Sequence, residues 1–474
     1  MKELLKEENL KLSFSDIETS RRAFLASFWN PKTDEWKDFR LDKYRNDISA
    51  LVKFLEQSLS QYDYIVYFNG LRFDGQVLEY IIRNSAKWYN KSWDAVCEDI
   101  YQFSQYVIKL TNSEQFPPYK EEYLSVKILD VFEIPHFSNK SRRTSLKWLE
   151  FMMDMDSIEE MPHHHTKMDW TEQEIQEQLS YCHWDIKAEY QWYLYLTGKV
   201  EHPLYKGKNK IQDRFDIINE GLLPIEAVNY SDSKIGDELN KMNYCKLTGK
   251  TPKDLYELKK KRNGTKSFTF GNAIPSYVNF KTPELQAFHK FISGIRVSLL
   301  ERDKKQKYPL SFRGTNYLIA RGGIHSTEKG RTIVISQDEL LRDADVGAQY
   351  PNEILKRVLY PTHLGIQWNQ IGAENIKLKD FYKQKFKDDP DPRWKGLEGL
   401  YKLALNSGYY GKTGETTNWQ YAPEVMYYCT IGNQFEILML IEMLELNGIH
   451  CVSANTDGIV CLFPKEKDDV YYKT

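Results

Sequence analysis

The segment LSFSDIETSRRAFLASFWN, residues 12–30, decides how the first part of the chain folds. Apolar residues lie on both sides of the pair Arg21–Arg22, so the segment is predicted to form two strands joined by a short turn. Alternate residues of a strand point to the same face, so Asp16 and Glu18 present their carboxylates together. A lone D-x-E sequence is more often an exposed strand than a site, and the surrounding sequence must supply the context.

A third carboxylate follows the apolar segment YDYIVYF, residues 62–68. This segment is predicted to be a buried strand, and it leads through the loop NGLRFDG into QVLEYIIRN, whose apolar residues have helical spacing. Asp74 therefore lies where a strand gives way to a helix.

A fourth carboxylate, Asp185, belongs to a long helical pattern over residues 172–196. It comes four residues after Tyr181, so both side chains lie on one helix face. Clustered carboxylates repel one another unless a cation neutralises them, and Mg²⁺ or Mn²⁺ is the natural cation for oxygen ligands. Two such ions can activate a water and stabilise the leaving oxygen in phosphodiester hydrolysis.

The order D-x-E, N-x-x-x-F-D and Y-x-x-x-D resembles the 3′–5′ proofreading exonuclease of family B DNA polymerases. The resemblance implies a ribonuclease H-like domain over residues 1–200, in which the four acids hold two metal ions and Tyr181 orients the attacking water. It also implies contacts to single-stranded DNA, for which the matching residues are Thr19, Asn69 and Phe73. Lys147 is a weaker candidate for a phosphate contact, and an exposed helix lysine is an equal alternative.

The segment LRDADVGAQYPNEIL, residues 341–355, is similar to motif A of the same family, D-x-x-S-L-Y-P. The similarity implies that Asp345 binds metal and that Tyr350 is the steric gate that excludes a 2′-hydroxyl. Ala348 and Gln349 depart from the usual Ser and Leu.

The segment YKLALNSGYYGKTGE, residues 401–415, resembles motif B, K-x-x-x-N-S-x-Y-G. Lys402 and Asn406 are four residues apart and share a helix face, and the resemblance implies that Lys402 neutralises the triphosphate of the incoming nucleotide. Tyr409 and Tyr410 both precede the glycine, so the sequence leaves open which of them packs against the nascent base pair.

Two further segments complete the resemblance. GIHCVSANTDGIVCLFP, residues 448–464, looks like motif C, Y-x-D-T-D-S, on a predicted hairpin. Asp457 takes the position of the second metal ligand and Asn455 that of the first, so the implied metal set is Asp345, Asp457 and the backbone carbonyl of Val346. ARGGIHS, residues 320–326, resembles the Y-x-G-G loop that touches the template, with Arg321, Gly322 and Gly323 as phosphate-contact candidates.

Charge is distributed unevenly along the chain. Residues 1–200 hold 33 acidic and 25 basic residues, whereas residues 241–313 hold 17 basic and 5 acidic residues. The second imbalance favours a polyanion partner. We therefore expect an α/β and α+β multidomain chain: exonuclease domain 1–200, basic connector 201–310, and palm 311–474 with short fingers at about 352–411.

Composition narrows the function classes. The chain has 474 residues, of which 41% are hydrophobic and 28% charged, which excludes wholesale disorder. No apolar run approaches the roughly 18 residues that span a membrane. The net charge of −2 excludes a uniformly basic DNA-coating protein, and six scattered cysteines favour a reducing cytoplasm, that of the infected host cell if the protein is from a phage.

The expected function is DNA-directed DNA polymerisation with 3′–5′ proofreading, for replication of a phage or viral genome. The expected partners are primer–template DNA, single-stranded DNA and deoxynucleoside triphosphates, with two Mg²⁺ or Mn²⁺ ions at each site. The sequence ends about one strand after motif C, so the family's thumb is expected to be absent or supplied by a separate chain. The alternatives are an exonuclease with an inactive polymerase half, and a non-catalytic DNA-binding replication factor.

Overall fold

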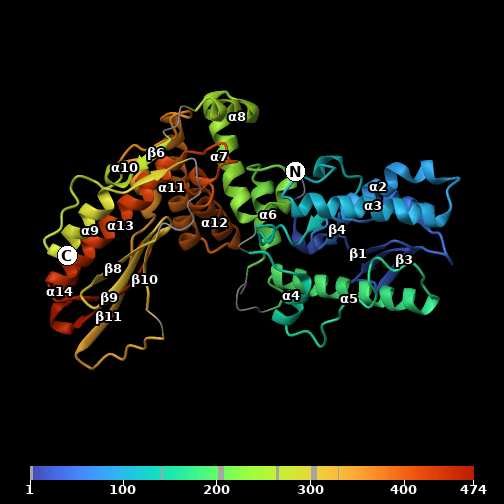
Figure 1. Cartoon of the computed structure of the whole chain (residues 1–474), viewed down its shortest axis with the longest axis horizontal. Helices are drawn as coiled ribbons and strands as arrows, with labels where there is room; N and C mark the ends of the chain where they lie inside the picture. Colours follow the sequence, from blue (N-terminus) through green and yellow to red (C-terminus); the bar gives the residue numbers. More distant parts are fainter. Residues whose placement is uncertain (1–3, 140–141, 201–207, 263–265, 300–306, 329) are drawn as a thin grey trace. The chain divides into compact units, whose positions relative to one another are not determined.

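The computed structural model describes residues 4–139, 142–200, 208–262, 266–299, 307–328 and 330–474 (Figure 1). Two compact units make up the chain, Met1–Asp232 and Ser233–Thr474. The predicted boundary after residue 200 adjoins residues 201–207, which lie outside the described residues, and the predicted boundary after residue 310 falls within a strand of the second unit.

A mixed five-stranded sheet forms the centre of the first unit, in the order β3-β2-β1-β4-β5. Its strands are β1 (Leu12–Ser20), β2 (Ala23–Asn30), β3 (Glu35–Leu41), β4 (Tyr64–Tyr67) and β5 (Ile128–Asp130). The first three strands are antiparallel, whereas β4 runs parallel to β1 and β5 parallel to β4. Strand β1 continues past the end of β4, so Asp16 and Glu18 lie beside the loop that follows β4.

Helices cover both faces of this sheet. They are α1 (Ile48–Gln61), α2 (Asp74–Asn84), α3 (Trp93–Asn112), α4 (Leu146–Met152), α5 (Glu172–Leu196) and α6 (Lys210–Asn219). Phe14 of β1 packs in one core with residues of α5, whereas Ile17 packs in another core with residues of α1, α2 and α3. Because Asp16 and Glu18 share the face of Phe14, their carboxylates point toward α5. The predicted helix 172–196 is confirmed, and a capping box between Thr171 and Glu174 explains where it begins.

An antiparallel six-stranded sheet forms the centre of the second unit, in the order β11-β13-β12-β10-β9-β8. Its strands are β8 (Lys307–Phe312), β9 (Thr315–Ala320), β10 (Gly323–Ser326), β11 (Glu339–Asp345), β12 (His450–Asn455) and β13 (Gly458–Pro464). A separate two-stranded sheet pairs β6 (Ser267–Thr269) with β7 (Arg296–Ser298). The predicted hairpin over residues 449–463 is confirmed by β12 and β13.

Helix α13 (Pro423–Leu446) contributes Ile431, Phe435 and Leu438 to the core that it shares with residues of the six-stranded sheet. The other helices of this unit are α7 (Asp232–Thr248), α8 (Pro252–Lys260), α9 (Pro283–Ser293), α10 (Gln349–Lys356), α11 (Gln367–Asp388), α12 (Pro392–Asn406) and α14 (Asp468–Lys473). A short connection joins α11 to α12, and the two pack side by side as a helical hairpin within the predicted fingers (Figure 1).

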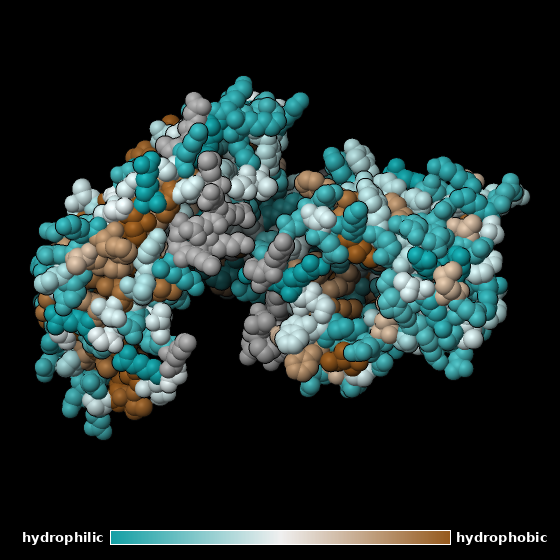
Figure 2. Space-filling model, viewed as in Figure 1, coloured by the Kyte–Doolittle hydropathy of each residue, from teal (hydrophilic) through white to brown (hydrophobic). Residues whose placement is uncertain are grey.

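Apolar side chains are mostly inside both units. Figure 2 shows hydrophilic residues over much of the displayed face, with scattered apolar residues between them. Across the residues that the structure describes, no helix combines the length and the apolar character needed to cross a bilayer. The apolar helix α13 instead buries most of its residues against the sheet.

Two glycines allow α7 to approach the end of α12. A Cβ on Gly408 would lie 2.2 Å from the backbone carbon of Gly236, and one on Gly236 would lie 2.7 Å from the carbonyl oxygen of Leu403. The contact is reinforced by buried Asp237, which accepts hydrogen bonds of 2.9 Å from Asn418, Trp419 and Gln420. This packing fixes the C-terminal end of the helix that carries Lys402 and Asn406.

Replacing Gly408 by Ala should destabilise the second unit by about 2 kcal/mol or more, because the new methyl group meets backbone that cannot move aside easily. Gly399→Ala is the matched control, since nothing lies within 4 Å of its Cβ position and Ala favours a helix by roughly 0.5–1 kcal/mol. Thermal unfolding of the two variants should give shifts of opposite sign. Equal stability of Gly408→Ala and wild type would contradict the close approach.

Candidate functional site

The first site is a cluster of acidic side chains between β1 and α5. Ligand oxygens of Asp16, Glu18 and Asp185 all lie within 4.8 Å of one another, and each of the three side chains is half-buried. Asp74, the first residue of α2, is only 4% exposed and interacts electrostatically with Asp16 and Glu18. The structure thus brings together the four acids that the sequence singled out, and three of them have the spacing that a shared metal ion requires.

Without a bound cation, burial and mutual repulsion disfavour the ionised form of these carboxyls. Burial, followed by the charges of its acidic neighbours, raises the pKa of Asp16 well above its ordinary value. The same causes, burial first and then Asp185 and Asp74, raise the pKa of Glu18 to about 8. Burial also raises the pKa of Asp74 to about 7 and that of Asp185 to about 6. A bound divalent cation would lower these pKa values again by favouring the ionised carboxylates. The set of oxygen donors therefore fits Mg²⁺ or Mn²⁺.

Lys147 of α4 lies inside this cluster rather than on an exposed helix face. Its ammonium donates to Asp185 Oδ1 at 2.5 Å and to Glu150 Oε1 at 3.1 Å, and it lies 4.5 Å from the centre of the Tyr181 ring. Burial, then the charges of Asp185 and Glu18, raises the pKa of Tyr181, so its hydroxyl remains a donor to Asp185 at neutral pH. The site therefore holds one cation and one proton donor beside its acids.

The loop after β4 is held by two buried acids that the sequence analysis did not single out. Asp130, at the end of β5, accepts hydrogen bonds from the backbone N–H of Asn69 and of Leu71 at 3.1 and 2.9 Å. Glu189, one turn beyond Asp185 on α5, is 2% exposed and accepts from the N–H of Phe68 at 3.1 Å. The spacing of four residues after Asp185 and the carboxyl end of a parallel strand were the available signals.

The three residues expected to contact single-stranded DNA have different surroundings in the structure. Asn69 has a left-handed backbone with φ of 73°, and its Oδ1 is buried with no hydrogen-bond partner among the described residues. Phe73 precedes α2 and packs against the core of α1–α3. Thr19 lies on the opposite face of β1 from the carboxylates, where its hydroxyl donates to Ser104 at 3.1 Å. The expected contact between Thr19 and DNA stays a prediction.

The second site lies at the end of β11. Asp345 pairs with Gly458 across the strands, and Val346 N–H donates to the carbonyl oxygen of Asp457 at 3.0 Å. Burial and then the neighbouring Asp345 charge raise the pKa of Asp457, and Lys402 opposes that rise. The structure therefore brings Asp345 and Asp457 together, with Val346 at the same point and Lys402 close enough to interact.

Tyr350 links this acidic pair to the glycine loop. Its hydroxyl donates to the carbonyl of Gly322 at 3.0 Å, and a Cβ on Gly323 would lie 3.2 Å from that hydroxyl. Gly323 has φ of 150°, so a larger residue there would be both strained and crowded. Arg321 packs on α13, with Nε 3.3 Å from the sulfur of Met426, and its side chain is only partly exposed.

The structure separates the two tyrosines that follow α12. Tyr409 is fully buried and stacks on Trp368 at 3.8 Å, which corrects the inclusion of Tyr409 as a nucleotide-contact candidate. Tyr410 instead lies beside Tyr350, with 4.5 Å between the ring centres. Lys402 and Asn406 are both exposed on α12, as their spacing predicted.

Three cations near the α11–α12 turn have local partners. Lys385 and Arg393 lie 3.5 and 4.0 Å from the ring centre of Trp394. Lys395 forms an ion pair with Glu398 at 2.6 Å. These contacts favour a structural role at the turn and leave Lys402 as the cation beside the acidic pair.

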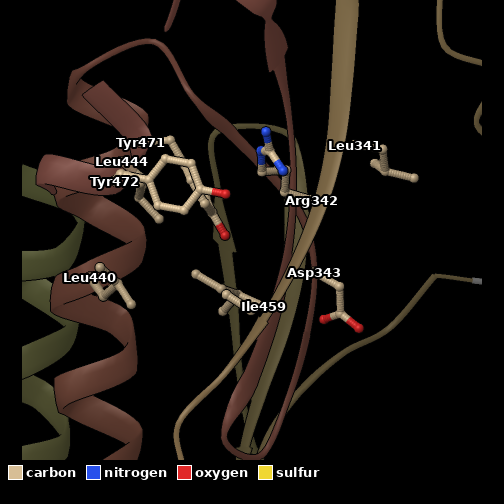
Figure 3. Close-up of a pocket in the computed structure, with 9 residues that line it drawn as sticks. Leu341, Arg342, Asp343, Leu440, Leu444, Ile459, Tyr471 and Tyr472 are labelled. Atoms are coloured by element: carbon tan, nitrogen blue, oxygen red, sulfur yellow. The ribbon is translucent and has the colours of Figure 1, made fainter. Parts of the chain in front are cut away.

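A cavity of about 470 Å³ is lined by residues of β11, β13, α13 and α14. Figure 3 shows Leu440 and Leu444 of α13 and Tyr472 of α14 on one side of the strand and Asp343 pointing to the other. Arg342 forms two hydrogen bonds of 2.7 Å with Asp468 of α14. Asp343 nevertheless lines this cavity, together with its β11 neighbours Arg342 and Ala344.

Comparison with known proteins shows the fold. No protein-family model and no curated protein matches the sequence. Among solved structures, the family B DNA polymerase from the hyperthermophilic archaeon Pyrobaculum calidifontis is similar to this chain, with a TM-score of 0.51 and 14% sequence identity. The similarity covers 98% of this chain and 55% of that chain, so this chain spans about half the length of that polymerase. The mixed α/β fold therefore resembles part of a family B polymerase.

Replacing Asp16 by Asn should stabilise the metal-free first unit at neutral pH. Carboxyls with raised pKa values bind protons in the folded state that the unfolded state has already released, so the stability of the wild type falls as pH rises from about 4. For Glu18 this loss continues up to its folded pKa of about 8. We expect the melting temperature of Asp16→Asn to exceed that of wild type by a few degrees at pH 8 with chelator.

Manganese should raise the melting temperature of the wild type much more than that of Asp16→Asn, because the variant lacks a ligand. Glu56→Gln, on the exposed face of α1, is the control and should match wild type in both respects. A wild-type melting temperature that does not fall between pH 5 and pH 8 in chelator would contradict the raised pKa values.

Proposed function

We propose that the protein is a DNA-directed DNA polymerase with a 3′–5′ proofreading exonuclease, and that it replicates a phage or viral genome. The observation that carries the proposal is the meeting of Asp345 and Asp457 beside Tyr350 and Lys402, on a fold like part of a family B polymerase. In this proposal residues 1–200 are the exonuclease domain, 201–310 a basic connector, and 311–474 the palm with fingers at about 352–411.

In nucleotidyl transfer, Asp345, Asp457 and the carbonyl of Val346 would hold Mg²⁺ or Mn²⁺. Such ions, when bound, favour ionisation of the primer 3′-hydroxyl and neutralise the charge on the leaving pyrophosphate. Lys402 supplies a fixed positive charge for the triphosphate, and Asn406 offers an amide one turn away on the same exposed face. Tyr350, held by Gly322, lies under the sugar and excludes a 2′-hydroxyl, while Tyr410 packs beside it against the base.

In the exonuclease reaction, the acids around Asp16 would hold the ions and the Tyr181 hydroxyl would orient the attacking water. Lys147 would exchange its contact with Asp185 for a phosphate oxygen of the DNA when a cation occupies the cluster, because the cation then satisfies that carboxylate. Asn69, together with Phe73, would hold the nucleotide at the 3′ end, as the family resemblance implies. The buried acids Asp130 and Glu189 keep the backbone of this loop in place.

One observation favours a narrower function, an exonuclease with an inactive polymerase half. The second site offers two aspartates, whereas Asn455 supplies a neutral amide where the family pattern has a third acid. The first site, by contrast, contains four acids, three of them within 4.8 Å of one another. Primer extension separates the two functions directly.

The double substitution Asp16→Ala/Glu18→Ala should abolish degradation of single-stranded DNA and leave primer extension unchanged, because the two sites use different acids. Asp345→Ala and Asp457→Ala should each reduce extension by at least 100-fold, roughly the loss of 2.7 kcal/mol of transition-state stabilisation, and leave degradation intact. Asp338→Ala is the control, an exposed aspartate of the same unit. Undiminished extension by Asp457→Ala would refute its metal-binding role.

Substitutions of Tyr350, Tyr410 and Tyr409 should each disturb a different property of the protein. Tyr350→Ala should increase incorporation of ribonucleotides, and Tyr410→Ala should raise the KM for deoxynucleotides without unfolding the protein. Tyr409→Ala should lower the stability of the second unit by about 3–5 kcal/mol, because its ring is fully buried against Trp368. Unchanged sugar selection by Tyr350→Ala in a steady-state incorporation assay would exclude it as the gate.

A further inference from the structure

In the six-stranded sheet, a row of residues that face one another across neighbouring strands runs from the acidic pair to a histidine. The register joins Asp345 of β11 to Gly458 of β13, Gly458 to Asn455 of β12, and Asn455 to His325 of β10. Residues directly opposite each other in an antiparallel sheet point to the same face. Asp345, Asn455 and His325 therefore project from one face.

The neighbouring row confirms which face this is. Each strand has a residue next to its member of the first row, and these neighbours pack in the core that contains residues of α13. They are Ala344, Ile459, Ala454 and Ile324. Because side chains alternate along a strand, the row that ends at His325 must lie on the opposite face, away from α13. The exposure of Asp345, Asn455 and His325 agrees with this placement.

From this row we propose that His325 binds the primer strand by donating a hydrogen bond from its imidazole to a backbone phosphate close to the 3′ end. The proposal rests on the proposed nucleotidyl-transfer function and assigns a contact with the primer strand to a histidine that the sequence analysis did not name as a candidate.

The distance along the row fits this contact. Three strand spacings separate β11 from β10, which is about 14 Å at about 4.8 Å each. One DNA strand rises about 3.4 Å per nucleotide, so the row spans roughly four nucleotides behind the bond that is being made. A phosphate at that depth lies over Asn455 and His325 if the primer leaves the acidic pair across the sheet.

The chemistry of the face also requires a donor here. Asp343, Asp345 and Asp457 make the region around the end of β11 anionic, and a DNA strand adds further negative charge. Arg321, on the loop before β10, is packed on α13 with its guanidinium 6.0 Å from the ring centre of Tyr427. An imidazole N–H can donate to a phosphate oxygen in either protonation state, and His325 is exposed for that purpose.

The test measures binding of a fluorescent primer–template by anisotropy, with full-length chains that carry Asp16→Ala/Glu18→Ala to prevent degradation. His325→Ala should weaken binding about tenfold, which is about 1.4 kcal/mol. His325→Gln, which keeps a donor, should recover most of the loss. Lys465→Ala, which removes an exposed cation just after the end of β13 that is remote from Gly458, is the matched control and should bind like the parent.

A second arm locates the phosphate. Primers with one neutral methylphosphonate at each of the four linkages nearest the 3′ end should include one that weakens binding by the parent chain and leaves His325→Ala unaffected. The proposal is overturned if His325→Ala binds primer–template as tightly as its parent. It is also overturned if none of the four methylphosphonates weakens binding by the parent chain alone. Primer extension that remains intact in either case leaves the polymerase function standing. Absence of duplex binding by the parent chain overturns it together with the polymerase function.

Discussion

Electrostatic repulsion among carboxylates is the constraint on which both sites depend. In the first unit, the fold places Asp16, Glu18 and Asp185 within 4.8 Å of one another and buries Asp74 beside them. Such an arrangement of ionised carboxylates is destabilising unless bound protons or a cation remove the repulsion. The sheet topology enforces it, because β1 runs past β4 and carries two acids against α5. Lys147 supplies part of the compensation within the chain.

Carboxylate repulsion also acts at the site in the second unit, where fewer acids meet. A strand end and a hairpin turn bring Asp345 and Asp457 together, and Lys402 offsets some of their repulsion. Asn455 carries no charge, so this site needs less compensation than the first. On the same exposed sheet face, His325 lies in the row that contains Asn455. The two sites therefore differ in how many like charges the fold holds together.

Many strands and helices, and the acids that they carry, could be predicted from the sequence, because the spacing of apolar residues differs between strands and helices. The helix 172–196 and the hairpin around Asp457 are examples. Long-range packing could not be predicted. Tyr409 and Tyr410 are equivalent by sequence, and only the position of Trp368 separates them. Alternation along β1 already puts Thr19 on the face opposite Asp16, but its partner Ser104, 85 residues away, could not be predicted. Glu189 remained hidden because its partner, the Phe68 N–H, is 121 residues away.

Calorimetric titration of Mn²⁺ into the protein at pH 7, in two buffers of different protonation enthalpy, tests the central claim most directly. The raised pKa values of Asp16 and Glu18 predict that the first ions bind with a net release of protons, since the carboxyls must ionise to become ligands. In Asp16→Asn the release should shrink and the affinity should fall. Binding without proton release, or binding unchanged in Asp16→Asn, would contradict a cation-dependent cluster at the end of β1.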